Sequence, residues 1–275
     1  MQILPHFDEF RDFLKQSCGI VLGDSKQYLV TSRISRIMTD NGIVDLHQLV
    51  SDIQHNPRGG LREKIIDAMT TNETSWMRDI HPFKIMREKV LPEMMASGFG
   101  SARIWCAACS TGQEPYSLSM VIEEFKQSQM GVLKRPVDIL GTDLSKTVLA
   151  QCEKAEYDSL AMVRGLSEDR KMRFFNPIDA GRVWRLKDEV KSRVQFKHFN
   201  LLDNYGLLGK FDVVFCRNVL IYFSSEQKSD ILRRIHSTLK PGGYLFLGAS
   251  ESLNDTQHLF DMVHCSPGII YRAKS

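Results

Sequence analysis

Two acidic residues follow segments that are rich in small and apolar side chains. Glu114 comes shortly after residues 107–112, and Asp143 directly follows residues 139–142. Small residues allow a backbone to approach a ligand closely. At a helix N-terminus, a carboxylate at 114 would repel phosphate but would suit a cation such as an ammonium group, whereas one at 143 could hold the two hydroxyls of a ribose. The competing interpretations are that Glu114 only complements a helix dipole and that Asp143 only caps the next helix.

A second set of polar residues interrupts or follows apolar stretches further along the chain. Arg217 and Asn218 break the apolar segment 211–223, and a polar group buried there would need a partner. Tyr222 lies near the end of this segment. Residues 198–203 provide polar groups where the amine of an adenine would lie.

These residues can meet only if the apolar segments form neighbouring strands. Strands are expected at 103–107, 137–141, 194–199, 211–216, 244–249 and 269–272. Helical periodicity separates most of them, at 114–126, 146–152 and 226–239. This alternation predicts an α/β fold with right-handed crossovers and a doubly wound, mostly parallel sheet. Ligands bind such sheets at the carboxyl ends of the strands, where the polar residues above are placed.

The remaining segments predict two further units. Apolar residues recur at helical spacing through the first 70 or so residues, which predicts an all-α N-terminal domain over 1–75. Residues 76–100 would hold a linker and the first helix of a larger domain over 101–275. Within that domain, residues at about 157–193 fit neither pattern and predict a small β subdomain, with Trp184 and Leu186 on a short basic strand.

Composition excludes several classes of protein. Apolar residues make up 43% and charged residues 25% of the 275, as in ordinary globular proteins, and the net charge of +3 is too small to indicate nucleic acid. The sequence contains neither a GxGxxG motif nor a Gly-Lys-Ser/Thr phosphate loop. No apolar run reaches membrane-spanning length and no signal peptide is evident, so a cytoplasmic location is expected. Cys106 and Cys109 form a CxxC pair, for which packing is favoured over a zinc or redox role, and no metal is expected.

Several of these segments together resemble the class I S-adenosylmethionine methyltransferases and, within them, the CheR family of chemoreceptor methyltransferases. The resemblance extends over essentially the whole chain. The segments that carry it are Thr70–Asp79 (TTNETSWMRD), Cys106–Ser119, Gly141–Asp143, Asn200–Leu202, Cys216–Phe223 (CRNVLIYF) and Leu239–Gly243.

The resemblance implies an activity and a set of cofactor contacts. The enzyme would transfer a methyl group from S-adenosylmethionine to glutamate side chains of chemotaxis receptors, giving methyl esters and S-adenosylhomocysteine. The residues that carry over as cofactor contacts are Asn72, Thr74, Arg78, Glu114, Asp143, Asn200, Leu201, Arg217 and Asn218. Tyr222 would lie near the transferred methyl, where it either has a catalytic or positioning role or is a packed aromatic ring with its hydroxyl at the surface. Because a glutamate side chain has a pKa near 4.3, it is already a nucleophile at pH 7 and needs no general base.

The resemblance also implies partners. Lys26, Arg33 and Arg36 would dock the acidic methylation helices in the cytoplasmic domain of a receptor, although spaced basic residues commonly form a solvated helix face. In some members of the family the β subdomain binds a receptor C-terminal tail as an added strand. The candidates for an exposed strand with a free edge here are Arg182, Trp184, Arg185 and Lys187, and the sequence leaves open whether this chain uses such a tether. We expect a monomer without nucleic acid or membrane insertion. The alternatives are a methyltransferase for another substrate and a signalling module that only binds the cofactor.

Overall fold

The computed structural model describes residues 4–57, 59–96, 100–128 and 133–275. Its N-terminal part is a bundle of helices, as predicted. The elements are α1 (Phe7–Cys18), η1 (Asp24–Lys26), α2 (Gln27–Asp40), α3 (Leu46–His55) and α4 (Gly60–Met69). Their apolar faces meet in one core around Phe10, Leu14 and Leu49, which are fully buried. Asp45 is the N-cap of α3, because its side chain accepts a 2.8 Å hydrogen bond from the backbone N–H of Gln48.

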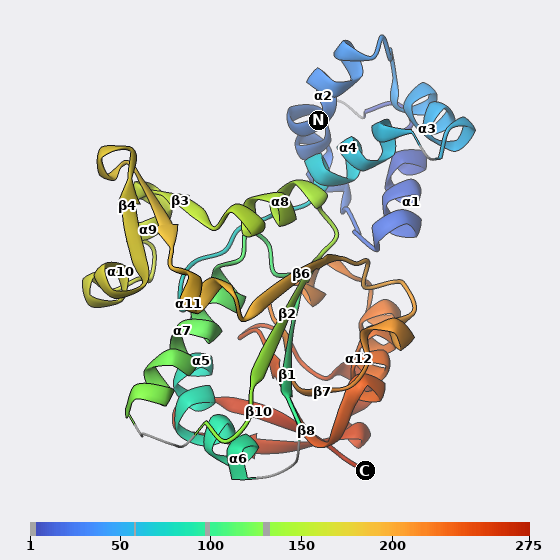
Figure 1. The fold of residues 1–275 in the computed structure, drawn as a ribbon. Helices are drawn as coiled ribbons and strands as arrows, with labels where there is room; N and C mark the ends of the chain where they lie inside the picture. Colours follow the sequence, from blue (N-terminus) through green and yellow to red (C-terminus); the bar gives the residue numbers. More distant parts are fainter. Residues whose placement is uncertain (1–3, 58, 97–99, 129–132) are drawn as a thin grey trace.

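The rest of the chain is built on a seven-stranded sheet with the order β6-β2-β1-β7-β8-β10-β9 (Figure 1). The strands are β1 (Ala102–Ala107), β2 (Val137–Asp143), β6 (Val194–His198), β7 (Phe211–Cys216), β8 (Leu239–Leu247), β9 (Phe260–His264) and β10 (Ile269–Ala273). β6, β2, β1, β7 and β8 pair in parallel, and β10 is antiparallel to both of its neighbours. The predicted fold class is therefore confirmed.

Helices cover both faces of this sheet, each over its own apolar core. They are α5 (His81–Ile85), the π-helical turn η2 (Met86–Val90), α6 (Leu91–Ala96), α7 (Gln113–Ser128) and α8 (Lys146–Lys154) on one side, and η4 (Tyr205–Leu208) and α12 (Ser225–Thr238) on the other. Two 3-10 turns, η5 (Leu220–Tyr222) and η6 (Asn254–Leu259), follow β7 and β8. Over the described ranges, no helix combines the length and apolar character needed to cross a membrane.

A small antiparallel sheet forms the predicted insertion and projects as an arm (Figure 1). It consists of β3 (Glu156–Asp158), β4 (Phe175–Ile178) and β5 (Val183–Leu186), with α9 (Ser159–Val163), α10 (Glu168–Phe174), η3 (Asp179–Gly181) and α11 (Asp188–Lys191) around them. The order is β3-β5-β4, so the strand that carries Trp184 pairs on both sides. The expectation that this strand offers a free edge is wrong, because its backbone groups already bond to β3 and β4.

The basic residues next to Trp184 are also engaged within the arm. Arg182 pairs with Asp179 at 2.7 Å and Arg185 pairs with Glu156 at 2.7 Å. Lys187 donates to the backbone carbonyl of Arg173, and Trp184 itself lies under the ammonium group of Lys171, 4.5 Å from the ring centroid. These contacts stabilise the arm itself, and the outer strands of this sheet are β3 and β4.

The helical bundle is joined to the large sheet at the carboxyl ends of its strands. Thr147 on α8 donates to Asp67 on α4 at 2.6 Å, and Lys146 pairs with Glu63 at 2.6 Å. The segment that follows α1 reaches the loop after β7, where the backbone N–H of Val21 donates to the carbonyl of Tyr222 at 2.9 Å. The bundle therefore closes one side of the region in which the ligand of such a sheet would lie.

Candidate functional site

A cavity lies over the carboxyl ends of β1, β2 and β7, between the sheet and the helical bundle. Its wall contains all ten residues that the sequence singled out for the cofactor and the methyl group: Asn72, Thr74, Arg78, Glu114, Asp143, Asn200, Leu201, Arg217, Asn218 and Tyr222. They come from the linker between the domains and from the ends of four strands or the loops that follow them. The structure thus brings together side chains that are up to 150 positions apart in the chain.

Asp143 ends β2 and is 7% exposed. One carboxylate oxygen accepts from the backbone N–H of Ser110 at 2.8 Å, and the other accepts from the N–H of Ser145 at 3.0 Å. Burial raises the pKa of Asp143 above its ordinary value, although these backbone hydrogen bonds oppose the shift. The cap of α8 is Ser145, whose hydroxyl accepts from Val148, so Asp143 is not the N-cap. Its carboxylate is instead fixed at the cavity wall, where it can accept hydrogen bonds from ligand hydroxyls.

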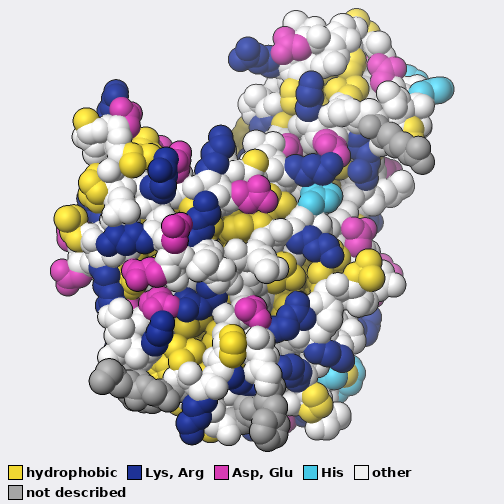
Figure 2. Space-filling model, in the orientation of Figure 1, with side chains coloured by type: hydrophobic (Ala, Val, Ile, Leu, Met, Phe, Trp, Pro, Cys, Tyr) yellow, Lys and Arg dark blue, Asp and Glu magenta, His cyan; other side chains and the backbone are white. Residues whose placement is uncertain are grey.

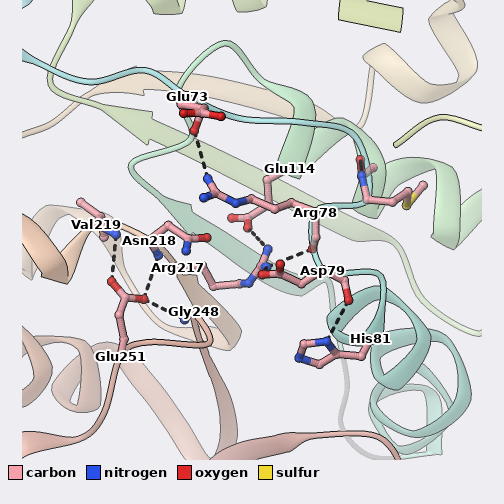
Figure 3. A network of polar contacts seen from close by, with 12 residues as sticks. Glu73, Arg78, Asp79, His81, Glu114, Arg217, Asn218, Val219, Gly248 and Glu251 are labelled. Carbon is pink, nitrogen blue, oxygen red and sulfur yellow. Dashed lines mark hydrogen bonds and ion pairs between the residues drawn. The ribbon is translucent and has the colours of Figure 1, made fainter. Parts of the chain in front are cut away.

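Glu114 lies in the first turn of α7 and forms an ion pair with Arg217 at 2.7 Å (Figure 3). Only 13% of the Glu114 side chain and 1% of the Arg217 side chain are exposed. Burial raises the pKa of Glu114, and the guanidinium of Arg217 opposes this shift. The partner predicted for a buried Arg217 is therefore Glu114, on the helix α7 that follows β1.

Arg217 also binds the turn at the end of the linker. Its guanidinium pairs with Asp79 at 2.7 Å and donates to the carbonyl of Arg78 at 3.0 Å. Asp79 and Ile80 have positive φ values of 67° and 54°, a conformation that is unfavourable for a β-branched residue such as isoleucine. The cation holds this turn in place while two carboxylates share one positive charge. Glu114, Asp79 and Arg217 together carry a net charge of −1 when ionised, which favours a cationic ligand group.

The linker is held against the sheet by hydrogen bonds to its backbone. The carbonyl of Asn72 accepts from the hydroxyl of Ser110 at 2.9 Å, and the carbonyl of Glu73 accepts from Arg78 at 3.0 Å. Arg33 on α2 supports the start of the linker, since its guanidinium donates to the carbonyls of residues 69 and 70 at 2.9 and 3.1 Å. Arg33 therefore stabilises the linker as well as being a candidate for receptor docking.

The three basic residues proposed for docking do not share one environment. Lys26 ends η1 and is exposed, and Arg36 on α2 is 93% exposed with only a 3.8 Å pair to Asp40. Arg33 lies half-buried against the linker. Positive and negative side chains alternate over the face shown in Figure 2 without one continuous basic patch.

Several residues of the cavity were not predicted from the sequence. Cys18 and Ile20 reach its wall from the end of α1, and the side-chain amide of Asn200 donates to the carbonyl of Ser17 at 2.8 Å. Asp79, next to Arg78 in the chain, contacts Arg217 behind this wall, and an acid beside an arginine was the sequence signal that could have indicated an ion pair there. Helix α1 gave no such signal, because its apolar periodicity only indicated a packed face.

The chemistry of this wall fits S-adenosylmethionine. Glu114 offers a carboxylate for the ammonium group, and Asp143 offers one for the ribose hydroxyls. The apolar side chains of Leu144, Phe199 and Leu201 line the cavity beyond Asp143, where an adenine ring would be covered. Cys106 and Cys109 are buried free thiols, and burial raises the pKa of both, which agrees with the packing interpretation.

Comparison with known proteins agrees with this chemistry. Residues 5–70 match the family described as "CheR methyltransferase, all-alpha domain", and residues 72–269 match "CheR methyltransferase, SAM binding domain". Chemotaxis protein methyltransferase Cher2 of Pseudomonas putida is 59% identical over 269 residues, which cover 98% of each chain. Chemotaxis protein methyltransferase 1 of Pseudomonas aeruginosa is also 59% identical, over 98% of this chain and 97% of the other. The chemotaxis protein methyltransferase of Salmonella typhimurium is 32% identical over 94% of this chain and 87% of the other. The chain belongs to the CheR family of methyltransferases, and its cofactor is S-adenosylmethionine.

Proposed function

We propose that the enzyme transfers the methyl group of S-adenosylmethionine to glutamate side chains of chemotaxis receptors. The products would be glutamate methyl esters and S-adenosylhomocysteine. The names of the relatives support a role in chemotaxis, and one observation supports a carboxylate as the acceptor. The two buried acids of the cavity, Glu114 and Asp143, are bonded to Arg217 and to backbone N–H groups, and no histidine or lysine is among the residues that line it. Glu73, a third acid on the wall, pairs with Arg164 at 2.8 Å, so the described lining residues offer no unpaired histidine, lysine or carboxylate as a base, as suits a nucleophile that is already ionised.

The residues of the cavity would then act by binding and orientation. Bound S-adenosylmethionine supplies an electrophilic methyl group on a sulfonium. Arg78 lines the cavity and, among the described residues, its guanidinium donates only to the carbonyl of Glu73, so it can also orient an incoming carboxylate. Tyr222 lies on the wall after β7 and can donate to the same group. Apolar neighbours exclude water, which favours a reaction in which opposite charges cancel.

The remaining cofactor contacts follow from the same arrangement. Asn72 and Thr74 on the linker would close over the cofactor, with Asn200 and Leu201 on its adenosine side and Asn218 on its other flank. The helical domain over 1–75 would bind the receptor, and the domain over 101–275 would hold the cofactor. The family matches at 5–70 and 72–269 support a division close to this one.

Receptor binding would use surfaces outside the cavity. Lys26 and Arg36 are exposed beside the bundle and are suited to an acidic helix, which would approach the mouth of the cavity along α2. If a receptor tail binds the small arm by strand addition, β3 or β4 must accept it, because these are its outer strands.

The test is methylation of purified receptor membranes with S-adenosylmethionine that is labelled in the methyl group. The expected result is label that mild alkali releases, as carboxyl esters do, and that is lost when the methylatable glutamates of the receptor are changed to alanine. Alkali-stable label would indicate a different acceptor. Tight binding of S-adenosylhomocysteine without any transfer would indicate a signalling module that only senses the cofactor.

A further inference from the structure

Glu251 lies in the loop after β8, and its carboxylate accepts four hydrogen bonds from backbone N–H groups. Figure 3 shows those from Asn218, Val219 and Gly248. Oε2 accepts from Gly248 at 2.7 Å and from Asn218 at 2.8 Å. Oε1 accepts from Val219 at 2.9 Å and from Leu220 at 2.7 Å. Three of the four donors belong to the loop after β7, so one side chain ties together the loops that follow two neighbouring parallel strands.

The conformation of the β7 loop explains why a carboxylate is needed there. Asn218 has a φ of 59°, in the left-handed region, so that three successive N–H groups point to the same place. Such a turn forms a concave anion-binding site, and the donors would be costly to leave without acceptors. Gly248 fits the arrangement closely, since a Cβ added there would lie 2.7 Å from Oε2 of Glu251 and 2.9 Å from the nitrogen of Asn218.

The loop that Glu251 holds forms one wall of the cavity. Asn218, Val219 and Tyr222 all line it, and Arg217 at the start of the loop binds Glu114. Glu251 itself is not among the lining residues. We propose that Glu251 is a positioning residue, which fixes the loop 217–222 so that Tyr222 and Asn218 face the methyl group and the acceptor. This inference rests on methyl transfer taking place in the proposed cavity.

The most informative variant is Glu251→Gln. Glutamine keeps the size of the side chain but replaces one acceptor oxygen with an NH₂ group, so two of the four backbone donors would face another donor. Glu251→Asp keeps the charge on a shorter side chain and should give an intermediate result. Ser250→Ala is the matched control, because Ser250 is exposed on the same loop and makes no hydrogen bond among the described residues.

Three measurements distinguish positioning from general damage. For Glu251→Gln we expect kcat with saturating receptor and cofactor to fall about 10- to 100-fold, as for a misplaced group. Affinity for S-adenosylhomocysteine should stay within a factor of about five, because Glu114 and Asp143 are held on other strands and removing a few contacts of one wall costs about 1 kcal/mol. In a double-mutant cycle, the loss of kcat in the double variant Glu251→Gln, Tyr222→Phe should be smaller than the product of the losses in the two single variants, because both residues act through the same loop.

The fourth readout does not depend on the acceptor. Hydrogen exchange at the amides of residues 218–220 should speed up by about tenfold or more in Glu251→Gln, while Ser250→Ala should match the wild type. Unchanged exchange would overturn the inference even if the receptor proved not to be the substrate. If the wild type is active, an unchanged kcat in Glu251→Gln would also overturn the inference. So would a parallel fall of kcat, cofactor affinity and melting temperature in that variant. A double variant with Tyr222→Phe whose loss in kcat equals the product of the two single losses would overturn it as well. Absence of ester formation by the wild type would contradict the proposed function instead.

Discussion

The two buried carboxylates of the cavity should recognise different parts of the cofactor, and this division can be tested with two ligands. S-adenosylhomocysteine carries an ammonium group, whereas 5′-methylthioadenosine has the same nucleoside and lacks the amino acid. If Glu114 binds the ammonium group, Glu114→Gln should weaken only the first ligand. If Asp143 binds the ribose, Asp143→Asn should weaken both.

The size of the effect follows from burial and charge. The Glu114 side chain is 13% exposed, and its change to glutamine would shift the net charge of the group with Asp79 and Arg217 from −1 to 0. A hydrogen bond to a charged group contributes about 1.5–3 kcal/mol, which corresponds to about 10- to 150-fold in affinity. We expect a loss in this range for S-adenosylhomocysteine with Glu114→Gln, and a change of no more than about twofold for methylthioadenosine.

Isothermal titration calorimetry on the purified chain would measure both affinities. Glutamine at position 114 can still accept from Arg217, so the variant should remain folded, and its melting temperature without ligand is the control. Equal losses for the two ligands in Glu114→Gln would refute the assignment, because they would show that the residue acts through the shape of the cavity. Unchanged affinity for S-adenosylhomocysteine would refute it as well.

Three further predictions concern the pH dependence, the interface of the domains and the basic face of α2. Burial raises the pKa values of the two cavity carboxyls above 4.5 and 3.8. Cofactor affinity should therefore weaken as the pH falls through these raised pKa values, because the carboxyls lose their negative charge. The same raised pKa values stabilise the unliganded fold at low pH, and this stabilisation is lost as the pH rises through them. Calorimetry across a pH series would measure the affinity, and thermal melting would measure the stability. Gly19→Val should lower the melting temperature by several degrees and weaken cofactor binding, because φ there is 78° and a Cβ would lie 2.2 Å from the Phe223 ring. Arg36→Glu should raise the KM for receptor and leave cofactor affinity unchanged. Arg33→Glu should lower cofactor affinity and stability, because Arg33 holds the linker. Steady-state kinetics and calorimetry would measure both, and an identical pattern for the two variants would contradict this reasoning.

The strands of the large sheet could be predicted because most of them are short apolar runs buried on both faces. β9 was missed, since its residues Phe260–His264 are mostly exposed at the edge of the sheet and the sequence alternates without a clear apolar run. β8 begins at Leu239, five residues before the strand predicted at 244–249, and its pairing with β7 shifts register between Phe211 and Val213. Local sequence patterns therefore predicted most strands of the large sheet. They did not predict the strand or the strand boundary that depends only on pairing with a neighbouring strand.

The same limit applies to the site. Glu114, Asp143 and Arg217 could be predicted because the topology of a parallel sheet places strand ends together. Nothing in the neighbouring sequence indicates that Glu251 serves the loop after β7, since its four donors lie on two loops. The order β3-β5-β4 of the small sheet could not be predicted either, because β5, which comes last of the three along the chain, lies between the other two.

A single helix, α2, carries two of the residues proposed for receptor docking and also contacts the linker at the cavity. Arg33 and Arg36 are one turn apart on α2, yet Arg33 bonds to the linker that carries Asn72, whereas Arg36 points into solvent. A receptor bound at Arg36 would therefore contact α2, the helix whose Arg33 holds the linker at the cavity wall. The segment that follows α1 adds a second connection, through the hydrogen bond from Val21 to Tyr222. Because both connections run from the helical bundle to the wall of the cavity, the bundle supports that wall in addition to its proposed role in receptor binding.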